Sequence, residues 1–114
     1  MKVIFNPNCS KCKTLEETLE SHSINWEKVE YLTTGLSQEM ILDLFDRYDG
    51  DWRNLIREKE NVFKDAGLNP REMDKNEMVE FLVKHPVAIQ RPLVIKDKKI
   101  VIARNDDGIQ KVMS

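Results

Sequence analysis

The spacing of apolar residues at the start of the chain changes from that of a strand to that of a helix and back. Lys2–Phe5 is a short, mainly apolar run that stops at the turn-forming "NPN", so we expect a strand there. From about Ser10 to His22, Leu15 and Leu19 recur at helical spacing, which predicts an amphipathic helix. Residues 24–32, "INWEKVEYL", have the composition of a second strand. The chain therefore opens as a β-α-β unit.

The middle of the chain has the spacing of helices. Ser37 is a suitable N-cap for a helix with a continuous apolar stripe. That stripe consists of Met40, Ile41, Leu44, Phe45 and Tyr48. A shorter helix is expected at residues 52–57. A third should run from Asp74 to about Lys84, because Asp74 and Glu77 have the spacing of a capping box.

The last third of the chain returns to strands. Residues 91–104, "RPLVIKDKKIVIAR", are two apolar runs around a polar turn, which predicts a β-hairpin, and residues 106–114 can form a terminal helix. The order is that of an α/β thioredoxin-like (glutaredoxin-like) fold with a helical insertion between the β-α-β unit and the C-terminal hairpin. With 114 residues, we predict a single domain over residues 1–114.

Composition and charge narrow the function classes. The chain is 40% hydrophobic and 33% charged, with a net charge of −2, so we expect neither nucleic acid nor a membrane surface as a partner. No apolar run approaches the roughly 18 residues of a membrane-spanning helix. Only three consecutive apolar residues precede Asn6, so we expect no signal peptide and a cytoplasmic protein. The charge pattern suggests no self-association surface, and a monomer is the default expectation.

The only two cysteines, Cys9 and Cys12, lie three residues apart where the first strand gives way to the first helix. Unpaired N–H groups and the helix dipole should stabilise a Cys9 thiolate and lower its pKa, and Lys11 and Lys13 act weakly in the same direction. In a cytoplasmic protein this motif is more often redox-active than structural. We therefore predict Cys9 as the nucleophile. Cys12 could resolve a mixed disulfide at Cys9 or could be inert, and the sequence leaves both open.

A zinc site is the competing interpretation of the cysteines. Structural zinc needs four ligands, and His22 and His85 would have to complete the set. His22 lies near the far end of the helix that begins at Cys9, roughly 20 Å away at the helical rise per residue. We therefore predict no metal site.

Three arginines, Arg57, Arg91 and Arg104, are candidates for a cation cluster at the cysteines. Arg91 precedes Pro92, and by analogy with thioredoxin-like folds a proline at the start of this strand is cis and lies beside the cysteine turn. Guanidinium groups bind tetrahedral oxyanions in a bidentate manner and keep their charge. A thiolate ringed by arginines would suit chemistry on a small oxyanion, because the cations offset like-charge repulsion.

Four segments together resemble a known family. These are "FNPNCSKCKT", "NLIREKENVFKDAGL", "FLVKHPVAIQRPLVI" and "VIARN", which in this order and spacing are similar to the glutaredoxin-dependent arsenate reductases of the ArsC family. The resemblance covers essentially the whole chain. It implies that Cys9 is the single catalytic cysteine. The residues implied to bind oxyanion and stabilise the thiolate are Arg57, Arg91 and Arg104, and Asn6 and Pro7 match the turn before the nucleophile.

The resemblance also implies a reaction. In the family the thiolate attacks arsenate, glutathione as co-substrate displaces water to form an arseno-thiol adduct, and glutaredoxin reduces it with release of arsenite, a reaction of arsenic resistance. No metal or bound organic cofactor is needed. We therefore expect glutathione and glutaredoxin as partners and a cytoplasmic reductase of arsenate or a similar small oxyanion.

Two residues depart from the family pattern. The best-known reductases have His at the position of Phe5 and Ser at that of Cys12. The C-x-x-C form is shared with the related redox regulator Spx, which binds the α subunit of RNA polymerase. Spx-like chains lack the final arginine that Arg104 supplies, which favours an enzyme. The alternatives are a dithiol oxidoreductase that uses Cys9 and Cys12, or an Spx-like redox-sensing transcriptional regulator.

Overall fold

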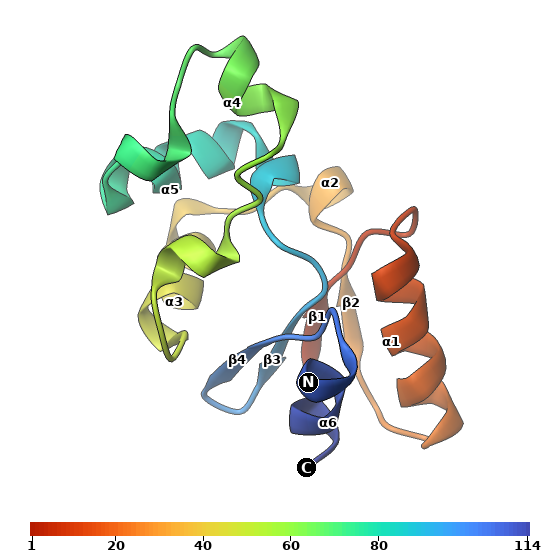
Figure 1. Ribbon diagram of the computed structural model, residues 1–114. Helices are drawn as coiled ribbons and strands as arrows, with labels where there is room; N and C mark the ends of the chain where they lie inside the picture. The colour runs from red at the N-terminus through yellow and green to blue at the C-terminus, as the bar shows by residue number, and fades with distance from the viewer. The chain divides into compact units, whose positions relative to one another are not determined.

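The computed structural model describes residues 1–114, and the contacts within it group these residues into two units. The first unit comprises residues 1–34 and 91–114, and the second comprises residues 35–90. The second unit therefore occupies the position in the sequence where a helical insertion was predicted. The single domain inferred from chain length stays a prediction. Figure 1 shows the helices and strands of both units along the chain.

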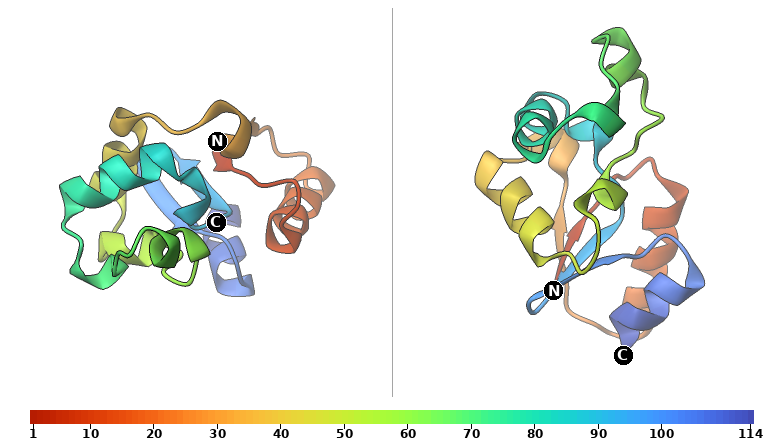
Figure 2. Two further views of the ribbon diagram at one scale, coloured as in Figure 1. Left: turned by 90° about the horizontal axis from the view of Figure 1, so that it is seen from above. Right: turned by 60° about the vertical axis from the view of Figure 1, so that its left-hand side comes forward.

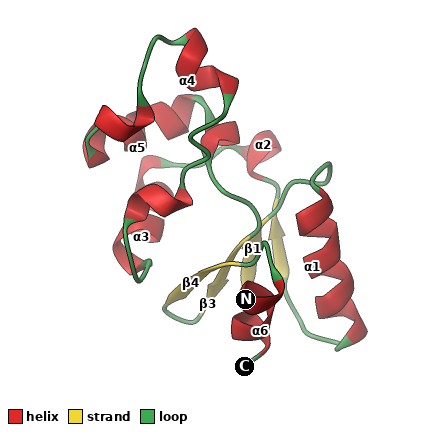
Figure 3. Cartoon of the chain, in the orientation of Figure 1, coloured by secondary structure: helices red, strands yellow, loops and turns green.

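The first unit is built on a four-stranded sheet. Its strands are β1 (Lys2–Ile4), β2 (Glu27–Val29), β3 (Leu93–Lys96) and β4 (Lys99–Ile102). They lie in the order β2-β1-β3-β4, with β1 parallel to β2 and antiparallel to β3, and β3 and β4 form the predicted hairpin. Figure 3 shows the strands in yellow. This arrangement confirms the thioredoxin-like α/β fold.

Two helices of this unit share one core with the sheet. Helix α1 (Ser10–Ser21) contributes its buried apolar stripe, and α6 (Asp106–Met113) contributes Val112 to the same cluster. The buried members of the cluster are Val3, Phe5, Cys12, Leu15, Leu19, Val94, Ala103 and Val112. Figure 2 (right) shows α1 and α6 beside each other. Because Cys12 belongs to this core, one of the two cysteines is fixed by packing against the sheet.

The second strand is shorter than predicted. Ordered pairing covers only Glu27–Val29, and the chain then enters a helical turn, α2 (Tyr31–Thr34). Tyr31 is fully buried, whereas Glu27 and Lys28 on the strand are exposed. The apolar residues 24–32 therefore divide between a short edge strand and the turn that follows it, which a single alternating pattern does not reveal.

The second unit consists of short helices. Its α-helices are α3 (Gln38–Arg47), α4 (Asn61–Asp65) and α5 (Lys75–Lys84), and its 3-10 helices are η1 (Trp52–Leu55), η2 (Pro70–Glu72) and η3 (Pro86–Ala88). Ser37 caps α3 as predicted, since its hydroxyl accepts a hydrogen bond from the Met40 N–H at 3.1 Å. Asp74 and Glu77 form the predicted capping box of α5, with hydrogen bonds of 2.8 and 3.1 Å.

Two features of the second unit differ from the sequence prediction. The helix expected at residues 52–57 is a single 3-10 turn that ends at Leu55, so Arg57 lies beyond it. Helix α4 was not predicted, because its five residues bury only Phe63 and are too short for a helical period to show. Phe63 stacks on Phe81 of α5 with ring centroids 4.7 Å apart, which fixes this short helix.

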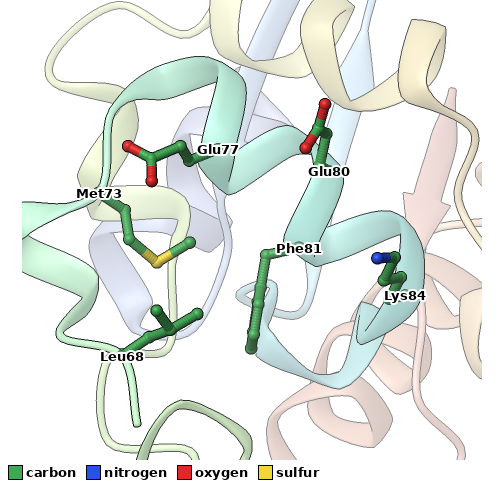
Figure 4. A pocket seen from close by; sticks show the side chains of 6 residues that line it. All are labelled: Leu68, Met73, Glu77, Glu80, Phe81 and Lys84. Carbon is green, nitrogen blue, oxygen red and sulfur yellow. The ribbon is translucent and has the colours of Figure 1, made fainter. Parts of the chain in front are cut away.

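The second unit also carries a small surface pocket of about 200 Å³. Its lining residues are Leu68, Met73, Glu77, Glu80, Phe81 and Lys84, shown in Figure 4. The lining of the pocket contains no cysteine and none of the three candidate arginines. Nowhere in the chain does a helix combine the length and the apolar character that crossing a bilayer requires.

Candidate active site

The nucleophile turn is organised by Asn6. Its carbonyl accepts a hydrogen bond from the Cys9 N–H at 3.0 Å, which closes a four-residue turn with Pro7 in its second position, where proline is favoured. Its side-chain Oδ1 accepts the Asn8 N–H at 2.9 Å. Asn6 is only 6% exposed, whereas Pro7 is exposed. The sequence "NPNC" therefore forms a rigid turn that delivers Cys9 to the start of α1.

Cys9 occupies the N-cap position of α1. Its carbonyl accepts the Lys13 N–H at 3.1 Å, and its side chain makes no capping hydrogen bond of the Ser or Asp kind. Burial acts to raise the pKa of the Cys9 thiol, but the nearby backbone N–H groups of Cys12 and Lys11 outweigh it by stabilising the thiolate, assisted by the Cys12 thiol and the Arg91 guanidinium. The pKa of Cys9 is consequently lowered to about 7. This is the low-pKa thiol that the helix position predicts.

Cys12 has the opposite character. It is completely buried, and its Sγ accepts a hydrogen bond from the Asn6 N–H at 3.5 Å. Burial raises the pKa of Cys12, and the neighbouring Cys9 charge adds to this against the weaker effects of Asn6 and Arg91, so that the pKa reaches about 12. At neutral pH the pair therefore combines a partly ionised Cys9 with a protonated Cys12.

Arg91 and Pro92 lie where the fold analogy predicted them. The Arg91–Pro92 peptide bond is cis, and Pro92 is buried at the start of β3. The Arg91 guanidinium lowers the pKa of Cys9, and its charge acts in the same direction on Cys12. The structure thus brings Arg91 to the cysteine turn.

Arg104 reaches the same segment from the other strand of the hairpin. It lies two residues beyond Ile102, where β4 ends, and not at the last strand position as predicted. Its Nη1 donates a hydrogen bond of 2.5 Å to the Arg91 carbonyl oxygen. Four predicted site residues, Cys9, Cys12, Arg91 and Arg104, are therefore linked within the first unit.

Arg57 belongs to the second unit. Its Nε forms an ion pair with Glu60 Oε1 at 2.9 Å, and its N–H donates to the Ala88 carbonyl at 2.8 Å. The Arg57 side chain is 27% exposed. Its participation in the site stays a prediction.

Phe5, where the best-known relatives have His, is a core residue here. It is 2% exposed, its ring lies 5.9 Å from that of Trp26, and the Lys28 Nζ is 4.4 Å from its centroid. Lys28 in turn pairs with Glu16 at 2.8 Å. The contact of Lys28 with the Phe5 ring was not predicted from the sequence, where the only available signal was the position of Lys28 on the exposed side of a short strand. Phe5 therefore supplies packing next to the nucleophile turn and no acid–base group.

The histidine considered as a zinc ligand has another partner. His22 follows α1, and its Nδ1 lies 2.9 Å from the Thr18 carbonyl oxygen. No group of three or more His, Cys, Asp or Glu side chains in the chain is arranged to hold a metal ion.

The chain is similar over nearly its whole length to known proteins. The sequence model of the ArsC family matches residues 5–112. An arsenate reductase of Neisseria meningitidis is 28% identical over 114 residues, which cover 99% of this chain and 97% of that protein. The global transcriptional regulator Spx of Streptococcus pyogenes is 20% identical over 98% of this chain and 84% of its own. The solved arsenate reductase of Vibrio cholerae matches with a TM-score of 0.82 and 26% identity, over 99% of this chain and 96% of that one.

Proposed function

Because the chain belongs to the ArsC family, we propose that it is an oxidoreductase that reduces arsenate, or a similar small oxyanion, through the Cys9 thiolate. Glutathione is the co-substrate and glutaredoxin the electron donor in this proposal. The observation that carries it is the position of Cys9 at the N-terminus of α1, in the unit that also holds Arg91 and Arg104, where the pKa of its thiol is lowered. The similarity to the arsenate reductases of Neisseria meningitidis and Vibrio cholerae supports the choice of substrate.

The first step is nucleophilic attack by Cys9 on arsenic. With a pKa of about 7, roughly half of Cys9 is thiolate at pH 7, against about 3% for an unperturbed cysteine. The sulfur forms an S–As bond, one arsenate oxygen takes up protons and leaves as water, and arsenic remains pentavalent. Arg57, Arg91 and Arg104 offset the repulsion between thiolate and oxyanion and stabilise the charge of the transition state.

Two further thiols supply the two electrons. Glutathione replaces a second arsenic oxygen, which also leaves as water, and arsenic then carries two sulfur substituents. The glutaredoxin thiolate attacks the glutathione sulfur, and the electron pair of the broken As–S bond stays on arsenic, which becomes trivalent. Water displaces Cys9, which regains its proton as arsenite leaves. One oxyanion and two thiols thus give arsenite and one mixed disulfide.

A second candidate is a dithiol oxidoreductase in which Cys12 attacks a mixed disulfide at Cys9. The observation in its favour is the pairing of a reactive Cys9 with a buried Cys12 one helical turn away. An Spx-like regulator is the remaining alternative, supported by the 20% identity to the Streptococcus pyogenes protein. Both share the turn with the leading proposal, but a thiol that only exchanges disulfides has no need of oxyanion-binding arginines such as Arg91 and Arg104.

Wild type, Cys9→Ser and Cys12→Ser should be compared in NADPH-coupled arsenate reduction with glutathione and glutaredoxin. Loss of turnover in Cys9→Ser, with turnover kept in Cys12→Ser, is the expected result. Absence of arsenate turnover in wild type, together with a Cys9–Cys12 disulfide under oxidant, would replace the leading proposal by the dithiol one. Capture of the RNA polymerase α subunit in one redox state would instead support the regulator.

The compartment and the oligomeric state that we propose follow from the same chemistry. The cytoplasm is the compartment that we propose, because a reduced glutathione pool is needed to regenerate the thiols. We also propose a monomer, since each chain carries its own Cys9, Arg91 and Arg104 in one unit. Size-exclusion chromatography with light scattering tests the latter.

A further inference from the structure

The hydrogen bond from Arg104 to the backbone of Arg91 is the feature of the hairpin that the family resemblance does not explain. The register ends with Leu93 paired with Ile102, and the chain segments Arg91–Pro92 and Ala103–Arg104 continue from this end of the hairpin. The Ala103 N–H donates to the Pro92 carbonyl at 3.1 Å. Pro92 has no N–H with which to return this bond, so the backbone ladder is incomplete at this pair.

The side chain of Arg104 supplies the next hydrogen bond across the hairpin, beyond the last one between backbone groups. Its Nη1 donates to the Arg91 carbonyl oxygen at 2.5 Å, so two consecutive carbonyls, those of Arg91 and Pro92, are held from residues 103 and 104. We infer that Arg104 is a positioning residue that acts on Cys9 through Arg91, by holding the backbone of the Arg91–Pro92 segment. The inference rests on the proposed function, in which Cys9 is the nucleophile.

The cost of this arrangement argues for a role. The end of the hairpin brings two arginines together, and their like charges repel unless something negative accompanies them. The carbonyl oxygen of Arg91 offsets part of that repulsion by accepting from Arg104. A guanidinium has five N–H groups, so the donors that Arg104 does not use at Arg91 stay available for an oxyanion.

The connection from Arg104 to the reacting sulfur has two links. Arg104 holds the backbone of Arg91, and the Arg91 guanidinium stabilises the Cys9 thiolate. Loss of the first link frees the Arg91 backbone and weakens the second, so that the Cys9 thiolate loses part of its stabilisation. An Arg104 that only bound oxyanion would leave the pKa of free Cys9 unchanged and would affect only the steps in which arsenate is bound.

The test is a double-mutant cycle read by the pH dependence of Cys9 alkylation without any oxyanion. The variants are Arg104→Gln, Arg91→Gln and the double variant, in a Cys12→Ser background so that iodoacetamide reports only Cys9. Gln lacks the guanidinium that donates to the Arg91 carbonyl from residue 104. Arg71→Gln, which removes an exposed arginine paired with Glu58, is the matched control for loss of one positive charge.

Arg104→Gln should raise the midpoint of the alkylation profile. A Cys9 that becomes a tenfold weaker acid is about one-tenth thiolate at pH 7 instead of one half, and its alkylation there slows about fivefold. In the Arg91→Gln background the same change should have no further effect, because its route to Cys9 is already broken. Arg71→Gln should leave the profile unchanged.

Two results would overturn the inference. An unchanged profile in Arg104→Gln would make Arg104 a substrate ligand only, and effects that add in the double variant would mean that its charge acts on Cys9 directly. Because the profile needs no arsenate, failure of arsenate turnover in wild type would refute the proposed function without touching this test.

A measurement on the wild-type chain keeps the inference falsifiable if the Arg104 variants do not fold. A guanidinium held through one Nη rotates slowly, so its nitrogen-15 spectrum should show separate Nη signals for Arg104 at low temperature. Arg71, with a side chain 78% exposed, should show one averaged signal. An averaged signal for Arg104 would refute the hold on the Arg91 carbonyl.

Discussion

Gly108→Ala separates what helix propensity predicts from what the packing of α6 predicts. Gly108 lies in the first turn of α6, and its N–H donates to the Asn105 side chain at 2.8 Å. Alanine is favoured over glycine inside helices by about 1 kcal/mol, so propensity alone predicts stabilisation. A Cβ at this position, however, would lie 2.2 Å from the Ile102 carbonyl oxygen and 3.0 Å from the Ala103 Cα.

The packing effect should dominate. Overpacking typically costs about 1–3 kcal/mol, and here the upper end applies because both obstructing atoms belong to the backbone and cannot rotate away. Subtraction of the propensity gain leaves a net loss of about 2 kcal/mol, which for a chain of this size lowers Tm by roughly 10 °C. The helix can relieve the overlap only by moving away from residues 102–103, next to Arg104.

Urea unfolding followed by circular dichroism measures this loss. Gln110→Ala, at an exposed position of the same helix, is the control and should change the free energy of unfolding by no more than a few tenths of a kcal/mol. Gly108→Ala at or above wild-type stability would refute the close approach of α6 to the end of β4.

Three further predictions concern the cysteines and one helix cap. Alkylation of Cys9 should reach half its maximal rate near pH 7, and an alkylation midpoint above pH 8 would contradict this. Because the lowered pKa stabilises the folded thiolate, the free energy of unfolding of wild type relative to Cys9→Ser should fall as the pH drops from about 9 to about 6. Cys12→Ala removes the thiol hydrogen bond to Cys9 and should move the alkylation midpoint to higher pH, whereas an unchanged midpoint would mean that the backbone N–H groups suffice. Asp74→Ala removes the acceptor for the Glu77 N–H and should cost about 1 kcal/mol in urea unfolding, and no loss would show that water replaces the cap.

The elements that sequence predicted well are those with a long period or a local chemical signal. Leu15 and Leu19 at helical spacing were enough to predict α1, and Ser37 and the Asp74 capping box marked where α3 and α5 begin. The hairpin followed from two apolar runs around a polar turn, where Asp97 adopts a positive φ of 55°. Each of these signals lies within about ten residues of sequence, and so it does not depend on distant packing.

The elements that sequence did not predict depend on contacts with distant residues. The five-residue α4 is fixed by the stacking of Phe63 on Phe81, 18 residues later in the chain. The division of residues 24–32 into β2 and α2 depends on pairing with β1 and on burial of Tyr31. Neither the ring contact nor the parallel pairing leaves a mark in the local pattern.

The site shows the same division. The position of Cys9 at a helix start could be predicted because the turn "NPNC" and the helix adjoin it in sequence. The cis bond at Pro92 was predicted by fold analogy and is confirmed. The bond from Arg104 to the Arg91 carbonyl could not be predicted, since it depends on the hairpin register and on the side-chain conformation of one residue.

The contrast between the two sulfurs also decides the order in which they can react. Cys12 is held protonated by burial and by the charge and hydrogen bonding of the Cys9 thiolate. Once Cys9 is bonded to arsenic or to glutathione it carries no charge, so only burial still raises the pKa of Cys12, against the Asn6 N–H and Arg91. Cys12 thus becomes a better nucleophile only after Cys9 has reacted. The single-cysteine and dithiol reactions therefore share their first step, nucleophilic attack by Cys9. They differ in the second step, which glutathione completes in the first reaction and Cys12 in the other, so Cys12→Ser should abolish only the dithiol reaction.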